Sequence, residues 1–239
     1  MKITILGYGR MGHEIEKVAE KRGHEIVAKL NKGWSSLPEC DVVIEFTTPK
    51  EAPQNILMAL QQNLPVVSGT TGWLEQWEDI VDYVEAMNGT LFYASNFSIG
   101  VHIFRKITKE LARYMNALPE YDVSLEEVHH IHKLDYPSGT ALSIAKDILE
   151  QLARKSDIQS YLAPADLPQT VTEKTIPIHS IREGEVAGIH RVTFDSHQDT
   201  IRLEHEAHGR EGLALGAVLA AEYIQGKKGI FNMDHLLKL

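Results

Sequence analysis

Short apolar runs alternate with longer segments of helical periodicity in the first part of the chain, up to residue 96. The apolar runs predict strands over 2–6, 25–30, 41–46, 66–68 and 90–94. Between them, apolar positions three and four residues apart predict helices over 13–22, 51–62 and 74–87. Strands that alternate with helices in this way form a parallel sheet with helices on both faces, which is an α/β fold.

The pattern changes after Asn96, where helices are expected over 101–115 and 140–153 and a strand over 121–128. From about residue 171 to residue 208, apolar and polar positions alternate, and the polar segment 195–199 predicts a turn between two strands. These strands predict an antiparallel or mixed open sheet in a smaller α+β domain. We interpret 154–170 as a polar loop and 212–225 as a final apolar helix that packs back on the first domain.

A G-x-G-x-x-G motif follows the first predicted strand and opens the first helix. Its glycines permit a tight turn, let the backbone approach a pyrophosphate, and let helix and strand pack closely. The helix N-terminus adds N–H groups and a partial positive charge. We expect a Rossmann-type dinucleotide-binding domain over 1–97 and 209–239, with a second domain over 98–208. The expected cofactor contacts are Gly7, Tyr8, Gly9, Arg10, Met11 and Gly12; the alternative is a glycine-rich turn without a ligand.

The end of the second predicted strand bears on the choice of cofactor. A carboxylate for the adenosine ribose is usual about 20 residues after the glycines, but Asn31 and Lys32 stand there. Asn31 can hydrogen-bond a ribose hydroxyl, and Lys32 can meet a 2′-phosphate unless it is a solvated loop lysine. We therefore expect NADPH to be accepted at least as well as NADH.

Two further segments, 68–72 (SGTTG) and 94–100 (ASNFSIG), follow strand ends at the same edge of the sheet. Ligands of open α/β sheets bind at this edge, and small or hydroxyl side chains allow close backbone contact. Asn96 has the donor and acceptor that a carboxamide requires. Each segment alone is as typical of a simple loop, but together with the glycine motif they outline a nicotinamide site.

The highest concentration of titratable side chains lies in 126–141, which reads EEVHHIHKLDYPSGTA. His129 and Lys133 can serve as proton donors, and Pro-Ser-Gly-Thr is typical of a helix start whose N–H groups can bind a carboxylate. In an unbroken strand these two side chains would be about 13 Å apart, at about 3.3 Å per residue. We therefore expect the strand to end near His130 and the chain to curl toward Pro137. A histidine cluster also suggests zinc, but no cysteine accompanies it, and no metal is expected.

Composition and charge exclude several classes of function. The chain has 239 residues, 43% apolar and 24% charged, enough for one large or two small domains. Its net charge of −9 argues against a nucleic acid or an anionic membrane as the main partner. Cys40 is the only cysteine, so no intrachain disulfide is possible. The apolar segment at the N-terminus is too short for the hydrophobic region of a signal sequence. The longest apolar run, 213–221, is far shorter than the roughly 20 residues that span a membrane. We therefore expect a cytoplasmic protein.

The segments GYGRMG, EFTTP, SGTTGW, ASNFSIG and above all EEVHHIHKLDYPSGTAL resemble the 4-hydroxy-tetrahydrodipicolinate reductase family, formerly called dihydrodipicolinate reductase. The tail from His205 to Met233 is similar too, so the resemblance covers essentially the whole chain. It implies NADH- or NADPH-dependent reduction of a cyclic dicarboxylic imine in the diaminopimelate and lysine pathway. It also implies a homotetramer assembled through the sheets of the second domain, which would be the substrate-binding and oligomerisation domain.

The resemblance assigns roles to individual residues. It implies that His129 is the proton donor or acceptor and Lys133 the second proton donor. The implied substrate contacts are His130, Lys133, Ser138, Gly139 and Thr140, and the implied nicotinamide contacts are Gly69, Thr70, Thr71, Ala94, Ser95, Asn96 and Phe97. The chain departs from the family pattern in a shorter glycine loop, in Glu45 where Asp is usual, and in Asn31 with Lys32 where some members have an acid and an arginine.

Two other functions remain open. One is another two-domain NAD(P)-dependent amino-acid dehydrogenase, which would share the first domain but not the segment HHIHKLDYPSGT. The other is a non-enzymatic NAD(P)-sensing regulator, which would be expected to carry a basic nucleic-acid-binding segment.

Overall fold

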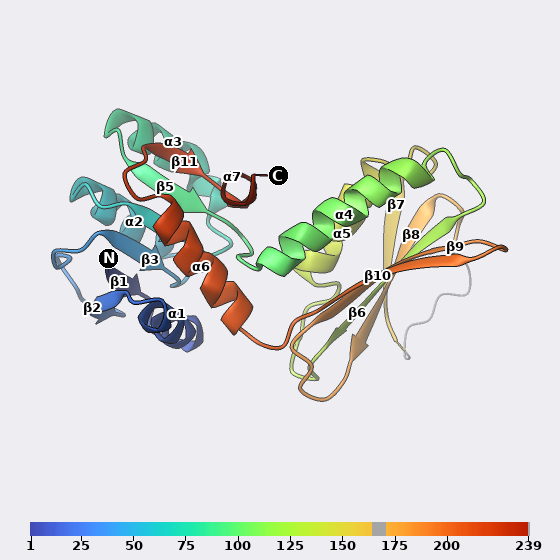
Figure 1. Ribbon diagram of the computed structural model, residues 1–239, viewed down its shortest axis with the longest axis horizontal. Coiled ribbons are helices and arrows are strands. Elements are labelled where there is room, and N and C mark those ends of the chain that lie inside the picture. Colours follow the sequence, from blue (N-terminus) through green and yellow to red (C-terminus); the bar gives the residue numbers. More distant parts are fainter. Residues whose placement is uncertain (164–170, 239) are drawn as a thin grey trace. The chain divides into compact units, whose positions relative to one another are not determined.

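The computed structural model describes residues 1–163 and 171–238 (Figure 1). The chain divides into two compact units. The first unit consists of Met1–Ile99 and Arg210–Leu239, and the second unit of Gly100–Gly209. Chain segments from both ends therefore build the first unit, while the second unit is continuous in sequence.

The first unit contains a parallel sheet of six strands in the order β11-β5-β4-β3-β1-β2. Its strands are β1 (Lys2–Leu6), β2 (Glu25–Leu30), β3 (Val42–Glu45), β4 (Val66–Ser68), β5 (Thr90–Tyr93) and β11 (Gly229–Phe231). Its helices are α1 (Arg10–Lys21), α2 (Ala52–Gln61), the 3₁₀ turn η1 (Leu74–Gln76), α3 (Trp77–Ala86), α6 (Glu211–Tyr223) and α7 (Met233–Leu237). The strand order reverses at β1, which places a ligand-binding switch point between the ends of β1 and β3.

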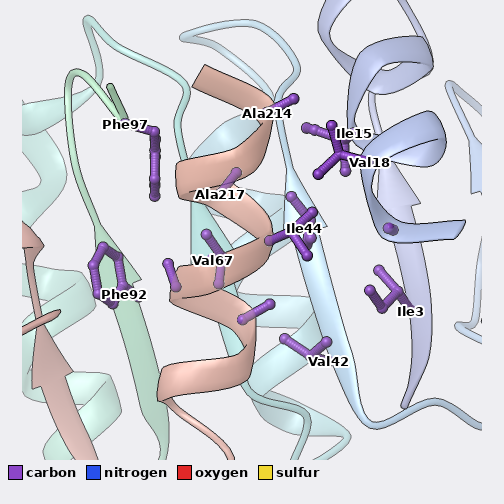
Figure 2. Packing of buried hydrophobic residues seen from close by; sticks show 14 of the residues in the cluster. Ile3, Ile15, Val18, Val42, Ile44, Val67, Phe92, Phe97, Ala214 and Ala217 are labelled. Atoms are coloured by element: carbon purple, nitrogen blue, oxygen red, sulfur yellow. The ribbon is translucent and has the colours of Figure 1, made fainter. Parts of the chain in front are cut away.

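Side chains of the first-unit strands alternate between two apolar clusters, one on each face of the sheet. Val42 and Ile44 belong to the cluster under α1 and α6, whereas Val43 belongs to the cluster under α2 and α3. Figure 2 shows Ala214 and Ala217 of α6 among the residues of the first cluster, with Ala214 directed toward Ile15. These small side chains let α6 approach the sheet closely and complete the apolar core on this face.

The second unit contains a mixed sheet of five strands in the order β10-β9-β6-β8-β7. Its elements are α4 (Ile99–Met115), β6 (Asp122–His129), α5 (Gly139–Leu149), β7 (Asp157–Leu162), β8 (Thr175–Arg182), β9 (Ile189–Asp195) and β10 (Thr200–Glu206). Strand β8 is parallel to β6 and β7, and β9 is antiparallel to β6 and β10. Apolar side chains of α4 and α5 pack with those of the strands in one cluster.

The structure confirms the predicted fold class, a Rossmann-type parallel sheet followed by a smaller α+β unit. The interpretation of 154–170 as a loop is wrong for Asp157–Leu162, which forms the edge strand β7, while 164–170 lie outside the described residues. A purely antiparallel second sheet is also wrong, because β8 pairs in parallel with both of its neighbours. The helix expected to be final is followed by β11 and α7.

Helix boundaries differ from the prediction by a few residues. Helix α1 begins at Arg10, because the glycine loop leads directly into it, and the segment 74–87 opens with a 3₁₀ turn. The helix predicted over 140–153 ends at Leu149. Within the described part of the chain, no helix is both long enough and apolar enough to cross a membrane.

Candidate active site

The glycine loop of the first unit leaves no room for side chains at two of its three glycines. Gly7 has a φ of +90°, and a Cβ there would overlap the carbonyl oxygen of Phe46. A Cβ on Gly12 would lie 2.5 Å from the Gly7 carbonyl oxygen. At Gly9, by contrast, a Cβ would meet nothing within 4 Å, and Gly9 is the N-cap of α1 without a side-chain cap. The free first turn of α1 and the open space above Gly9 fit a pyrophosphate group.

Asn31 fixes the glycine loop to the end of β2. The Tyr8 N–H donates to Asn31 Oδ1 at 2.8 Å, so the Asn31 side chain keeps its amide N–H groups and the second lone pair of Oδ1 for a ribose. The Tyr8 hydroxyl donates to Glu16, whose carboxylate also pairs with Lys29. The hydrogen bond to Glu16 raises the pKa of Tyr8. The loop is thus anchored on both its backbone and its aromatic side chain.

The remaining predicted contacts on the adenosine side are more exposed. Lys32 is largely exposed, and its Nζ lies 3.6 Å from Glu51 Oε1. Arg10 is exposed at the start of α1, while Met11 is half-buried and packs against the cluster under α1 and α6. Lys32 and Arg10 are therefore the cations of this loop region that a phosphate on the ribose could attract.

Glu45 ties together the two loops that follow β3 and β4. Its fully buried carboxylate accepts hydrogen bonds from Ser68 Oγ at 2.7 Å and from Thr70 Oγ1 at 2.8 Å. It also accepts from the backbone N–H of Thr47 at 2.9 Å and from the Thr47 hydroxyl. Position 69, next to this carboxylate, requires a glycine, because a Cβ there would overlap the ring of Phe46. This carboxylate shapes the predicted Gly69-Thr70-Thr71 contact segment, and sequence reasoning gave it no role.

Backbone hydrogen bonds join the predicted nicotinamide segments at one edge of the sheet. Gly69 N–H donates to Glu45 O at 2.9 Å, and Ala94 N–H donates to Ser68 O at 3.4 Å. In the second segment, Asn96 Oδ1 accepts from Ser98 N–H at 2.8 Å. The Phe97 ring is buried, so only its backbone can face a ligand. Ser95 is exposed and Thr71 lies in the exposed turn after Thr70.

The second unit places His129 at the end of β6, where the strand was expected to stop. Its Nδ1 lies 3.0 Å from Glu127 Oε2, and its ring centroid lies 5.3 Å from that of His190. Gly188 passes beside the other ring nitrogen, because a Cβ there would lie 3.1 Å from His129 Nε2. The imidazole is thus held at Nδ1 while a glycine keeps space at Nε2.

Glu127 is a fully buried carboxylate with three partners. Besides His129, its Oε1 accepts from Ser138 N–H at 3.1 Å and from Arg182 Nη2 at 3.2 Å. Burial opposes ionisation, but the close contact with His129 and the hydrogen bond from Ser138 outweigh it and hold the pKa of Glu127 well below its usual range. The site therefore contains a permanent anion behind His129.

The loop after β6 curls as the spacing required. The N–H of Lys133 donates to His130 O at 3.1 Å, and Lys133 Nζ donates to both carboxylate oxygens of Asp135 at 2.8 Å. The bond from Lys133 lowers the pKa of Asp135. His132 pairs with Glu185 at the surface.

Helix α5 begins directly after this loop. Its N-cap Ser138 accepts from Ala141 N–H at 3.1 Å, and a Cβ on Gly139 would meet nothing within 4 Å. The first turn therefore presents the backbone of Gly139 toward open space, as an anion site requires. Ser138 Oγ also lies 3.2 Å from His190 Nε2. Burial lowers the pKa of His190 to about 4, so this imidazole is neutral at pH 7.

Among the described residues, Glu127, His129 and His190 form a buried group whose potential metal-ligating atoms lie within 4.8 Å of one another. The Glu127 carboxylate already faces the Arg182 guanidinium, so it is compensated by a protein cation. We interpret this group as a carboxylate–histidine pair with a neighbouring neutral histidine. Sequence reasoning missed Glu127, Arg182 and His190.

Comparison with known proteins settles the family. The family model for the N-terminus of dihydrodipicolinate reductase matches residues 1–97, and the model for its C-terminus matches residues 100–237. The chain belongs to the dihydrodipicolinate reductase family. It is 44% identical to the 4-hydroxy-tetrahydrodipicolinate reductase of Christiangramia forsetii, over 99% of this chain and 98% of that one. It is 35% identical to the Staphylococcus saprophyticus protein of the same name, over 99% of this chain and 100% of that one.

Solved structures share the fold. The dipicolinate-bound enzyme from Paenisporosarcina sp. TG-14 has a TM-score of 0.77 at 24% identity, covering 97% of each chain. A probable dehydrogenase from Thermotoga maritima has a TM-score of 0.60 at 10% identity, covering 99% of this chain and 93% of that one. In this member of the dihydrodipicolinate reductase family, the predicted cofactor contacts lie within the first unit, and the predicted proton donors and anion site within the second.

Proposed function

We propose that this chain reduces 4-hydroxy-tetrahydrodipicolinate to tetrahydrodipicolinate with NADPH or NADH, a step of diaminopimelate and lysine biosynthesis. The observation that carries the proposal is that His129, Lys133 and the N-terminus of α5 lie in one short segment. They do so in a chain that the two reductase family models match over nearly its whole length. The name of its Christiangramia forsetii relative supports the same substrate.

The two compounds differ by the hydroxyl at ring position 4. The net reaction replaces that hydroxyl by hydrogen, so one hydride and one proton are consumed and one water leaves. Bound NAD(P)H supplies the hydride. The chain must hold the dicarboxylate, supply the proton and stabilise the negative charge that develops on the ring after hydride addition.

The second unit supplies the groups that a dicarboxylate requires. The backbone of Gly139 and Thr140 at the start of α5 would bind one carboxylate. His130 and Lys133, from the preceding loop, would contact the substrate beside it. The partner of the Lys133 ammonium in the present structure is Asp135, and a substrate carboxylate would compete with Asp135 for this cation.

His129 is the proposed proton donor. Because the anionic Glu127 faces Nδ1, that nitrogen is held as a donor toward the carboxylate, and Nε2 is the atom that exchanges a proton with substrate. Gly188 supports this assignment, because any larger residue would crowd Nε2. Lys133 would serve as the second donor and as the cation that stabilises the developing charge.

In the first unit, the glycine loop fits the pyrophosphate, and the segments Gly69–Thr71 and Ala94–Phe97 would hold the nicotinamide. Lys32 would bind the 2′-phosphate of NADPH, which supports use of NADPH at least as well as NADH. Hydride donor and dicarboxylate must meet, so the proposal includes closure of the units about hinges near 96–100 and 207–212, with exclusion of water.

Assembly and location are also proposals. We expect a cytoplasmic homotetramer that forms through the sheets of the second unit, as the family resemblance implies. On β6, β9 and β10, Arg191 bridges Glu126 and Glu204 across adjacent strands, so charged residues would take part in such a contact if this face of the sheet is used. Analytical ultracentrifugation of the full chain would test the tetramer.

Turnover of the family substrate tests the function. The substrate is generated in a coupled assay, and oxidation of NADPH and NADH is followed separately. Dicarboxylate-dependent oxidation of either nucleotide supports the proposal. Binding of NADPH without any turnover of the dicarboxylate would overturn it and favour the nucleotide-sensing alternative, and turnover of an amino acid instead would favour an amino-acid dehydrogenase.

A further inference from the structure

Arg182, at the end of β8, binds three segments around the proposed proton donors. It pairs with His129 in the parallel register of β6 and β8. Its Nη2 donates to Glu127 Oε1 at 3.2 Å and to Asp135 O at 2.7 Å, and its Nε donates to Lys133 O at 3.2 Å. The side chain is only 13% exposed, and its bonds to Glu127 and Lys133 are partly buried. One guanidinium thus connects the carboxylate behind His129 with the backbone of Lys133.

Glu127 extends this connection to the anion site. Its two oxygens face His129 Nδ1, Ser138 N–H and the Arg182 guanidinium. A displacement of the carboxylate would therefore move the imidazole and the start of α5 together. In the described residues, the pair Arg182–Glu127 touches every segment to which the proposed function assigns a proton donor or a substrate carboxylate.

Apolar packing holds the tip of this loop poorly. Leu134 is 93% exposed, and Ile131 and Tyr136 are exposed as well. Hydrogen bonds must therefore define where the backbone of Lys133 lies, and two of the carbonyl groups involved are bound by Arg182. A planar guanidinium can bind a carboxylate and two carbonyls at once, whereas a lysine ammonium cannot reproduce this fork.

We propose that Arg182 and Glu127 form a positioning pair that holds His129 and Lys133 at a fixed separation so that both act on one dicarboxylate. This inference rests on the proposed function. Neither residue needs to touch the substrate: Glu127 acts through His129, and Arg182 acts through Glu127 and the loop backbone.

The pair predicts a specific kinetic pattern. Arg182→Ala and Arg182→Lys should each lower kcat by about 10- to 100-fold, because a displacement of about 1 Å can cost that much. The KM for NADPH should stay within twofold of wild type. Glu127→Gln keeps an acceptor for Ser138 N–H but removes the charge behind His129, so it should lower kcat by a similar factor.

A matched control separates positioning from general destabilisation. Arg105, in the same unit, forms a partly buried bidentate pair with Asp147 at 2.6 and 2.9 Å. It lies on α4 and binds α5, away from the loop after β6. Arg105→Ala should cost comparable thermal stability and leave kcat within twofold of wild type.

The deciding experiment measures kcat, KM for both substrates and the thermal midpoint of wild type, Arg182→Ala, Arg182→Lys, Glu127→Gln and Arg105→Ala. Guanidinium ion, far below denaturing concentration, should raise kcat of Arg182→Ala several-fold, whereas methylammonium should not. An Arg182→Ala enzyme with wild-type kcat, or one that is folded and inactive yet unaffected by guanidinium, would overturn the positioning pair.

Further outcomes distinguish failure of the positioning pair from failure of the proposed function. Where Arg182→Ala does not fold, Glu127→Gln decides, and a kcat within twofold of wild type would overturn the inference. A wild-type chain that binds NADPH but does not turn over the dicarboxylate contradicts the proposed function itself. An active wild type with equally active variants contradicts only the positioning pair.

Discussion

The Nδ1 atom of His129 lies 3.0 Å from Oε2 of Glu127, a carboxylate with no exposed surface. A buried anion against one imidazole nitrogen assigns the proton exchange to the other nitrogen, Nε2. The role proposed for His129 as a proton donor depends on this relationship.

Replacing His129 by Ala should lower kcat by about 100-fold or more, within the range for loss of a general acid. NADPH affinity should be unchanged, because all proposed nucleotide contacts lie in the first unit. Steady-state kinetics and a nucleotide titration by fluorescence measure both effects. His132→Ala is the control, since His132 is an exposed neighbour paired with Glu185 and should turn over normally.

Replacing Lys133 by Ala should raise the KM for the dicarboxylate and lower kcat together, because the ammonium both binds a carboxylate and donates a proton. The exposed lysine of α5, Lys146, offers a matched charge removal at a distance from the loop. Wild-type kinetics for Lys133→Ala would remove Lys133 from the mechanism.

His190 should make the protein less stable in acid. Burial lowers its pKa to about 4, below the value of 6.5 that is usual for an exposed histidine. Between these values the unfolded chain binds a proton that the folded chain does not, so stability falls as pH drops from about 6.5 to about 4. The loss is up to about 3 kcal/mol, at about 1.4 kcal/mol per unit.

Urea unfolding at pH 7 and pH 5 measures this effect. His190→Gln should be less stable than wild type at pH 7, and its unfolding free energy should change less between the two pH values. An equal pH dependence in both proteins would show that His190 is not buried in its neutral form.

Lys32 should select for the 2′-phosphate. Lys32→Ala should raise the KM for NADPH by about tenfold, the size expected for one charge-assisted hydrogen bond, and leave the KM for NADH nearly unchanged. Glu51→Gln, which removes the partner 3.6 Å from Lys32, should not weaken NADPH binding. Equal effects of Lys32→Ala on both nucleotides would contradict this role.

Gly7→Ala should abolish nucleotide binding and destabilise the chain, because φ is +90° and the added Cβ overlaps Phe46 O. Gly23→Ala is the matched control. Its φ is +81°, but its Cβ would meet nothing within 4 Å. It should carry only the conformational cost, about 1–2 kcal/mol, and bind NADPH normally. Thermal unfolding and nucleotide titration distinguish the two variants.

Local patterns predicted most of the fold. Buried parallel strands such as β3 are short apolar runs between turn residues, and this signal needs no tertiary information. The strand β7 was missed because it lies at a sheet edge, where Gln159 and Ser160 interrupt the apolar pattern. Its parallel pairing with β8 depends on contacts that no local pattern encodes.

The candidate site was predicted where its residues are contiguous. His129, Lys133 and Ser138 lie within one segment, and the curl between them followed from strand geometry. Arg182 could not be predicted, because 55 residues separate it from Glu127 and only the pairing of β6 with β8 brings the two together. Asn31 shows a second limit, since nothing in the sequence indicates that its carbonyl oxygen accepts a hydrogen bond from the glycine loop.

The C-terminal origin of α6 and β11 has a consequence for synthesis of the chain. During synthesis, α6 can cover the sheet and β11 can join its edge only after all the described strands of the second unit, the last of which ends at Glu206, have been translated. A premature stop after Gly209 would therefore retain the loop after β6, with His130 and Lys133, but would leave Ile44 and Val67 without the helix that covers them.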